Sequence, residues 1–213
     1  MTHGKVSFAR LWALMLTVFV DMVGFLMILP LLPFYAERLG ATPFAIGLMI
    51  SAYAVAQLAT APTWGRLSDG HGRRPMMMLG VSIAASAHLL FAVACSDWAI
   101  DRFDSTGLIA LLFLSRFVQG AGGASTAVVQ AYVGDTVVPE ERAKALGWIT
   151  AATSAGVMLG PALGSLAANL GPSAPGLVAA ALCVVNLFFV ERFLPESASD
   201  EHRHQARTAP RGS

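Results

Sequence analysis

The chain has 213 residues, of which 55% are hydrophobic and 13% are charged, and its mean hydropathy is +0.62. A soluble domain carries about 25% charged residues, so this chain lacks the polar surface that a water-soluble globule needs. The net charge of +1 excludes an electrostatic nucleic-acid binder. The two cysteines, Cys95 and Cys183, show no disulfide or metal-ligand spacing. The composition therefore predicts an integral membrane protein.

Six apolar runs have lengths near the ~20 residues that a helix needs to cross a bilayer. They cover residues 11–32, 44–64, 76–95, 107–133, 145–170 and 173–190. Their continuity excludes the alternating strands of a membrane β-barrel. We therefore expect an all-α membrane protein with six transmembrane helices in residues 11–195, between a short N-terminal segment, 1–10, and a polar tail, 196–213. The first run contains Asp21 and no small-x-small cleavage site follows it, so we expect it to be retained rather than removed as a signal peptide.

Lysine and arginine are distributed unevenly among the connections, and this distribution predicts the orientation of the chain. Eleven of them lie before the first run, in the second and fourth connections and in the tail, whereas the first and third connections hold only Arg38 and Arg102. The third connection instead collects Asp97, Asp101 and Asp104. Because basic loops stay in the cytoplasm, we expect both termini on the cytoplasmic side of the cell membrane.

Two charged residues and one imidazole lie inside the apolar runs. With a rise of ~1.5 Å per residue, Asp21 lies ~15 Å from the cytoplasmic end of the first helix, His88 ~18 Å from that of the third, and Arg116 ~14 Å from the outer end of the fourth. All three therefore fall near the middle of a bilayer core that is ~30 Å thick. An unpaired charge at this depth costs at least ~2.5–3.5 kcal/mol. We expect Asp21 and Arg116 to face inward, toward each other or toward a wet cavity.

Two interpretations of these intramembrane groups compete. Asp21 and Arg116 could form a structural ion pair that fixes the helix register, or they could line a transport path, which is the usual role of such residues. His88 fits a neutral, hydrogen-bonded imidazole as well as a titrating site. Gln57 and Gln119 could form interhelical hydrogen bonds or contact the substrate. We favour the transport path for the two charged residues.

The second connection combines glycines, an acid and arginines in a short motif that runs from Gly65 to Pro75. Gly65 and Gly72 permit tight turns. Asp69 can cap the helix that starts near Pro75 or sit at a neighbouring helix N-terminus. Arg73 and Arg74 anchor the loop to the cytoplasmic side. A turn that only held positive charge inside would not require the acid and the two glycines.

This loop resembles the one between the second and third helices of the major facilitator superfamily, G-x-L-[SA]-D-[RK]-x-G-R-[RK]. The matching residues are Gly65, Leu67, Ser68, Asp69, Gly72, Arg73 and Arg74, and the departure is Gly70, where a basic residue is usual. In the family, the loop works as a cytoplasmic gate latch. The resemblance implies that Arg73 pairs with Asp135, at the cytoplasmic end of the fourth helix.

Two helical segments resemble further motifs of the same family. The segment from Arg116 through Gln119 to Gly122 is similar to a fourth-helix motif whose arginine is tied to proton transfer. The fifth-helix motif of drug/proton antiporters, G-x-x-x-G-P-x-x-G, is matched by Gly156, Gly160, Pro161 and Gly164. These glycines lie four apart on one face, where another helix can pack closely, and Pro161 kinks or softens the helix.

The first helix indicates which branch of the family the chain resembles. The segment from Asp21 to Pro33 is similar to the first helix of tetracycline/proton antiporters and their relatives. His88 takes the position of their functional third-helix aspartate, which weighs against tetracycline as the substrate. The resemblance implies one six-helix bundle built from two inverted three-helix triplets. It covers only the N-terminal half of a family member, which has two such bundles.

The resemblance implies a secondary transporter, or its N-terminal half, that exports a small, drug-like molecule against inward proton flow. A facilitated transporter of a polar metabolite such as a sugar or organic acid, and a truncated, non-transporting membrane protein, are the alternatives. The expected partners are the bilayer, the substrate and a C-terminal six-helix half in the same longer chain, a separate chain or a second copy. We expect no enzyme activity, cofactor or metal, because the chain has no G-x-x-x-x-G-K-[ST] loop, hydrolytic triad or metal-ligand cluster.

Overall fold

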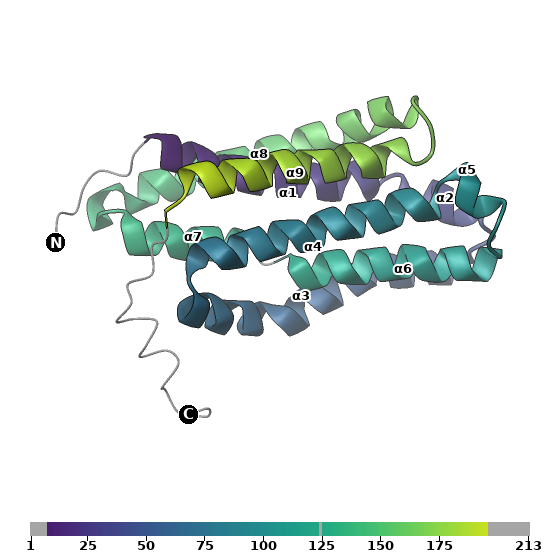
Figure 1. Ribbon diagram of the computed structural model, residues 1–213, viewed down its shortest axis with the longest axis horizontal. Coiled ribbons are helices and arrows are strands. Elements are labelled where there is room, and N and C mark those ends of the chain that lie inside the picture. The colour runs from purple at the N-terminus through teal and green to yellow at the C-terminus, as the bar shows by residue number, and fades with distance from the viewer. Residues whose placement is uncertain (1–7, 124, 196–213) are drawn as a thin grey trace.

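The computed structural model describes residues 8–123 and 125–195, and within these ranges every regular element is a helix. In chain order the helices are α1 (Phe8–Ile28), α2 (Leu32–Arg38), α3 (Pro43–His71), α4 (Arg73–Ala94), α5 (Asp97–Ile100), α6 (Ser105–Gly122), α7 (Ser125–Thr136), α8 (Pro139–Ala168) and α9 (Ala174–Phe193). They form an elongated bundle whose long helices run side by side (Figure 1). The expected all-α fold is confirmed.

Six helical spans in the described residues are long and apolar enough to cross a membrane. Each of the six predicted runs falls on one of these spans, and two of the spans comprise two helices each. The first consists of α1 and α2, which are separated where Pro30 and Pro33 remove backbone donors. The fourth consists of α6, which ends before Gly123, and α7, which begins at Ser125; Ala124 lies outside the described residues.

Two helices extend well beyond their apolar runs. Helix α3 continues to His71, whereas the run ended at residue 64, and α8 begins at Pro139, whereas the run began at residue 145. Charged residues end an apolar run but do not end a helix, because the last turns can leave the bilayer and remain hydrogen-bonded in water. At the start of α8, Glu140 and Glu141 also favour the helix N-terminus electrostatically.

The helix contacts repeat between the two halves of the bundle. Helix α1 packs on α8 and α9, α3 packs on α6, and α4 packs on both α6 and α9. Exchanging α1 with α6, α3 with α8 and α4 with α9 turns the α1–α8 contact into the α3–α6 contact and the α1–α9 contact into the α4–α6 contact, and it leaves the α4–α9 contact in place. Two three-helix units related by a two-fold axis would produce this pattern.

The glycine stripe of α8 packs directly on the backbone of α1. A methyl group built on Gly156 would lie 2.7 Å from the Phe19 carbonyl oxygen, and one built on Gly160 would lie 2.7 Å from Cβ of Leu26. A methyl on Gly164 would meet the Met27 carbonyl oxygen. The predicted close helix packing is therefore confirmed, with α1 as the partner. Pro161 is exposed inside α8, which continues as a helix beyond it to Ala168.

The connections that carry the family motifs lie at one end of the bundle. The start of α1, the α3–α4 and α7–α8 connections and the end of α9 share this end, on the left in Figure 1. Helices α2 and α5 and the turn between α8 and α9 lie at the opposite end. Because the chain crosses the bundle six times, the start of α1 and the end of α9 lie at the same end.

Candidate functional site: a charged loop cluster and a buried arginine

Arg73 is the centre of a charged cluster where α3 meets α4. Gly72, between the two helices, has φ +104°, a conformation that a side chain rarely adopts. The turn brings Nη1 of Arg73 to 2.7 Å from Oδ1 of Asp69. The same nitrogen donates to Oγ of Ser68 at 2.6 Å, and that hydroxyl donates to the Gly65 carbonyl oxygen at 2.8 Å. Asp69 therefore pairs with the arginine that begins α4. The sequence also allowed Asp69 to cap a helix starting near Pro75. That helix, α4, begins at Arg73 and has no side-chain cap.

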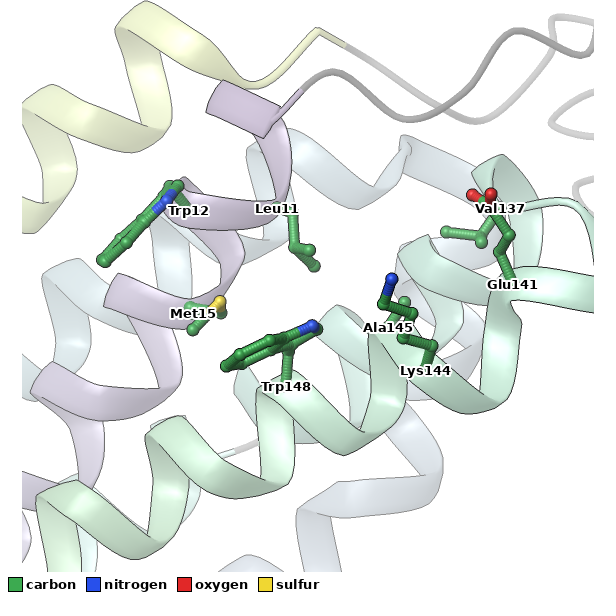
Figure 2. A pocket seen from close by; sticks show the side chains of 8 residues that line it. All are labelled: Leu11, Trp12, Met15, Val137, Glu141, Lys144, Ala145 and Trp148. Atoms are coloured by element: carbon green, nitrogen blue, oxygen red, sulfur yellow. The ribbon is translucent and has the colours of Figure 1, made fainter.

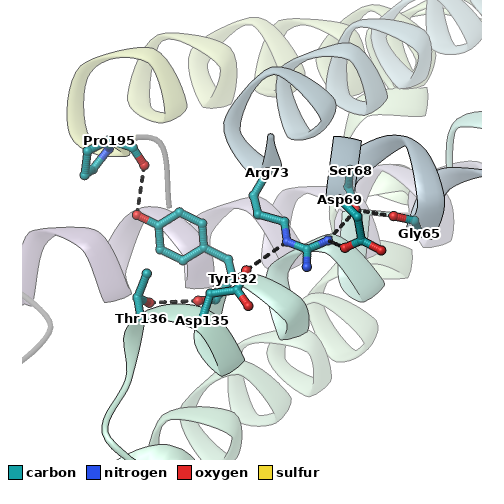
Figure 3. Close-up of polar contacts among 8 residues, drawn as sticks. All are labelled: Gly65, Ser68, Asp69, Arg73, Tyr132, Asp135, Thr136 and Pro195. Carbon is teal, nitrogen blue, oxygen red and sulfur yellow. Dashed lines mark hydrogen bonds and ion pairs between the residues drawn. The ribbon is translucent and has the colours of Figure 1, made fainter. Parts of the chain in front are cut away.

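The cluster extends to α7 through Asp135. Nε of Arg73 donates to Oδ2 of Asp135 at 3.0 Å, so the pairing expected from the loop motif is present (Figure 3). Only 12% of the Arg73 side chain is exposed, against 51% for Asp69 and 38% for Asp135. The guanidinium is thus enclosed by its partners, while both carboxylates still reach solvent. One side chain ties α3, α4 and α7 together.

Other polar contacts at this end were not anticipated from the sequence. Nη2 of Arg74 donates to the Glu191 carbonyl oxygen at 2.8 Å and so joins the start of α4 to the end of α9. The Tyr132 hydroxyl donates to the Pro195 carbonyl oxygen at 3.0 Å (Figure 3). Both acceptors are backbone atoms, which sequence motifs do not identify.

Arg116 lies on α6 and is completely buried. Its guanidinium carbon lies 5.5 Å from the centre of the Phe91 ring, and Nε lies 3.4 Å from Oγ of Ser115. Neither Nη1 nor Nη2 has a hydrogen-bond partner among the described residues. No hydrogen bond or ion pair between Arg116 and Asp21 is found among the described residues. The aromatic face compensates part of the cost of desolvating the cation.

Tyr53 on α3 lies against both α1 and α6, and sequence reasoning missed it. A methyl group built on Gly120 of α6 would meet the Tyr53 carbonyl oxygen. Its ring stacks on Phe25 with centroids 4.3 Å apart, and Nε2 of Gln57 lies 3.4 Å from its hydroxyl. Asp21 is partly buried. Tyr53 therefore brings a phenol to the packing of α1, α3 and α6, and the spacing of Tyr53 and Gln57 by one helical turn on α3 was the available signal.

The other polar residues predicted inside the apolar runs are His88, Gln57 and Gln119. Only 1% of His88 is exposed, and its Nδ1 has no hydrogen-bond partner among the described residues. A methyl group built on Gly24 would lie 2.7 Å from Nε2 of His88, so the imidazole packs on the backbone of α1. Gln57 donates to the Gly123 carbonyl oxygen at 2.9 Å. Gln119 is 2% exposed, and its Oε1 has no partner in the described part of the chain.

A groove of about 510 Å³ opens between the start of α1 and the start of α8. Its lining consists of Leu11, Trp12, Met15, Val137, Glu141, Lys144, Ala145 and Trp148 (Figure 2). None of these residues was predicted to form a site. The two tryptophans are about half exposed, as expected for indoles at a membrane interface.

The chain was compared with proteins of known sequence. Residues 14–212 match the family model described as "Major Facilitator Superfamily". "Multidrug resistance protein 2" of Bacillus subtilis is 31% identical over 90% of this chain and 45% of its own length. "Tetracycline resistance protein, class D" of Salmonella ordonez is 34% identical over 89% of this chain and 46% of its own length. The chain therefore spans about half the length of these relatives.

Solved structures agree with this match. The human organic anion transporter MFSD10 (TETRAN) superposes with a TM-score of 0.77 at 25% identity, over 94% of this chain and 50% of that one. A peptide transporter superposes with a TM-score of 0.70 at 17% identity, which shows the fold alone. Six long apolar helices, the charged loop and the family match lead to one conclusion: the chain is a multi-pass membrane protein that belongs to the Major Facilitator Superfamily.

Proposed function

We propose that the chain is one six-helix half of a transporter that exports a small, drug-like organic molecule in exchange for protons. The observation that carries the proposal is Arg116, a buried arginine without a carboxylate partner in the described residues, near Tyr53 and Asp21. Such a group is costly at mid-membrane and persists where it serves transport. The relatives named for multidrug and tetracycline resistance support export as its direction.

The intramembrane site has the groups that proton coupling needs. Asp21 supplies a carboxylate that can take up and release a proton, and Arg116 supplies a fixed positive charge that favours the ionised form. Tyr53 on α3 packs against α1 and α6, the helices that carry these two groups. One proton moving down 100 mV and one pH unit releases about 2.3 kcal/mol from the potential and about 1.4 kcal/mol from the pH difference. This energy supports a gradient of about 10²–10³-fold in a neutral solute.

The Arg73 cluster is the proposed cytoplasmic gate. It joins α3, α4 and α7 at the end of the bundle that also holds the start of α1 and the end of α9. The basic residues of the connections at this end support a cytoplasmic location. In this proposal the ion pairs close the cytoplasmic side, and their separation opens it.

A second six-helix half is the proposed partner. In the most apolar windows of α3 and α8, only 28% of residues are buried, against 39–56% in the other four spans. These two helices exchange places under the internal two-fold relation, so they offer a matched pair of apolar faces. The partner half belongs to the same longer chain, to a separate chain or to a second copy.

Transport in vesicles tests the function. The purified chain is reconstituted with and without a co-expressed C-terminal half of a family member, and dye or drug transport is measured with an imposed pH gradient. We expect proton-driven transport only when both halves are present. Gradient-driven transport by the chain alone would favour self-pairing, and its absence from both preparations would contradict the proposal.

A further inference from the structure

The groove between the start of α1 and the start of α8 is charged at one end and aromatic at the other. Glu141 and Lys144 lie at one end (Figure 2). The indoles of Trp12 and Trp148 lie at the other end. Along α8, Glu141 and Trp148 are separated by two helical turns, a rise of ~10 Å. The groove therefore presents charged groups and apolar surface in a fixed order to whatever occupies it.

This order follows the depth of the bilayer. The fifth apolar run begins at residue 145, so Glu141 and Lys144 precede it, whereas Trp148 lies just inside it. Trp12 likewise lies at the very start of the first apolar run. Tryptophan side chains favour the level at which headgroups meet acyl chains. The charged end of the groove is thus level with the lipid headgroups, and its aromatic end is level with the first part of the acyl chains.

The two charged side chains of the groove have no partners within the described part of the chain. Glu141 and Lys144 are exposed, and neither forms an ion pair or a side-chain hydrogen bond with a described residue. They lie three residues apart on one face of α8, which places their Cβ atoms about 5–6 Å apart. An acid and a base at this spacing suit a ligand that carries both charges close together.

Packed residues form the floor of the groove. Val137 and Ala145 belong to a buried hydrophobic cluster that joins α1, α7 and α8. Nε of Arg142 donates to the Val137 carbonyl oxygen at 2.9 Å and so fixes the connection between α7 and α8. The volume of about 510 Å³ is in the range of small-molecule sites. The space is sufficient for a lipid headgroup and the adjoining part of its acyl chains.

We propose that this groove binds a phospholipid whose headgroup carries a primary ammonium beside the phosphate. The Lys144 ammonium donates to the phosphate, the Glu141 carboxylate accepts from the headgroup ammonium, and the indoles contact the start of the acyl chains. Hydrogen bonds between charged groups are stronger than those between neutral groups. A quaternary choline ammonium has no N–H to donate to the carboxylate, and a headgroup with only negative charge is repelled by it.

The bound lipid would join the start of α1 to the start of α8, beside the connection that follows α7. A ligand that binds only the folded chain raises its stability, so this lipid should stabilise the end of the bundle that carries the Arg73 cluster. The assignment of the groove to the cytoplasmic leaflet rests on the proposed orientation, whereas the lipid site itself does not depend on the proposed function.

Tryptophan fluorescence of the purified full chain tests the proposal. The chain is placed in phosphatidylcholine nanodiscs that contain a small fraction of phosphatidylethanolamine, brominated near the glycerol end of its acyl chains so that it quenches nearby indoles. The groove signal is the part of the quenching that disappears in the double variant Trp12→Phe and Trp148→Phe. We expect this part to be about threefold larger than with equally brominated phosphatidylcholine or phosphatidylglycerol. Equal quenching by the three lipids would overturn the proposal.

Matched variants test the two headgroup contacts. Glu141→Gln should lower the preference for phosphatidylethanolamine over phosphatidylcholine by about fivefold, and Lys144→Gln should weaken the binding of both lipids. Glu140→Gln is the control for the acid, because Glu140 also lies in the first turn of α8 but does not line the groove. Arg66→Gln, an exposed base near the end of α3, is the control for Lys144. Equal effects of Glu140→Gln and Glu141→Gln would reject the proposed carboxylate contact.

Thermal unfolding in detergent gives a second readout that does not depend on the indoles. Added phosphatidylethanolamine should raise the unfolding midpoint of the wild type more than phosphatidylcholine does, and Glu141→Gln should abolish this difference. If a co-expressed C-terminal half removed the preferential quenching, the groove would be an interface between the halves and the lipid proposal would be wrong. Absence of transport would contradict the proposed function and would leave both lipid measurements valid.

Discussion

Arg73 and Asp135 are separated by 62 residues in sequence, yet Nε of the arginine lies 3.0 Å from Oδ2 of the aspartate. The contact joins the first residue of α4 to the end of α7. Because Asp69 shares the same guanidinium, the arginine has acidic partners on two different helices. Loss of one partner leaves the other in place, so the two contacts can be tested separately.

Asp135→Asn is expected to impair transport without reducing the amount of protein in the membrane. Its carboxylate is partly exposed, and ion pairs of this kind contribute about 0.2–1 kcal/mol to stability. Abundance by immunoblot and transport with the complementary half present are the measurements. Asp69→Asn should have the same signature, and Asp101→Asn, on the exposed loop at the opposite end, is the control. A parallel loss of abundance and transport would make the cluster a structural contact.

Gly160→Ala and Gly164→Ala are expected to destabilise the bundle by about 1–3 kcal/mol each, because the added methyl group collides with α1. Gly147→Ala, on the same helix, is the matched control, since its methyl group would meet nothing within 4 Å. The control should be neutral or slightly stabilising, by up to about 1 kcal/mol, through helix propensity. Thermal unfolding in detergent measures all three variants. Equal behaviour of the three would contradict the observed helix contact.

Asp21→Asn is expected to abolish uphill efflux in the complete transporter and to spare part of substrate binding. The variant keeps the size of the side chain but cannot exchange a proton at physiological pH. Substrate accumulation under an imposed pH gradient is measured beside equilibrium binding of the same compound. If this variant accumulated substrate as the wild type does, Asp21 would not be the coupling residue, and His88 or a residue of the second half would be the next candidate.

Cysteines introduced at residues 71 and 105 are expected to react from opposite sides of the membrane. His71 and Ser105 are both exposed, one at the end of α3 and the other at the start of α6. An impermeant maleimide should label position 105 in intact cells and position 71 only after permeabilisation. Cys95 and Cys183 are buried, so the native thiols serve as the background control. The reverse labelling pattern would overturn the proposed orientation.

Hydropathy and charge in the sequence predicted the six spans, the loop and helix motifs carried the family resemblance, and that resemblance implied the contact between Arg73 and Asp135. These properties are local, or they belong to a motif whose spacing is written in the chain. The approach of another helix to Gly156, Gly160 and Gly164 also followed from their spacing, because three small residues on one face leave room for a neighbour. The identity of that neighbour, α1, did not follow.

Tertiary structure alone decided which partner each buried polar group takes. Gln57 was expected to bond between helices or to contact substrate, and its partner is the backbone oxygen of Gly123, 66 residues away. Arg116 lies over the ring of Phe91, a contact that the sequence did not predict. The indole N–H of Trp64 on α3 donates to the Ala121 carbonyl oxygen on α6 at 2.6 Å. Every residue has the same backbone carbonyl, so the sequence does not show which carbonyl a buried side chain will bind; the packing of the helices decides it.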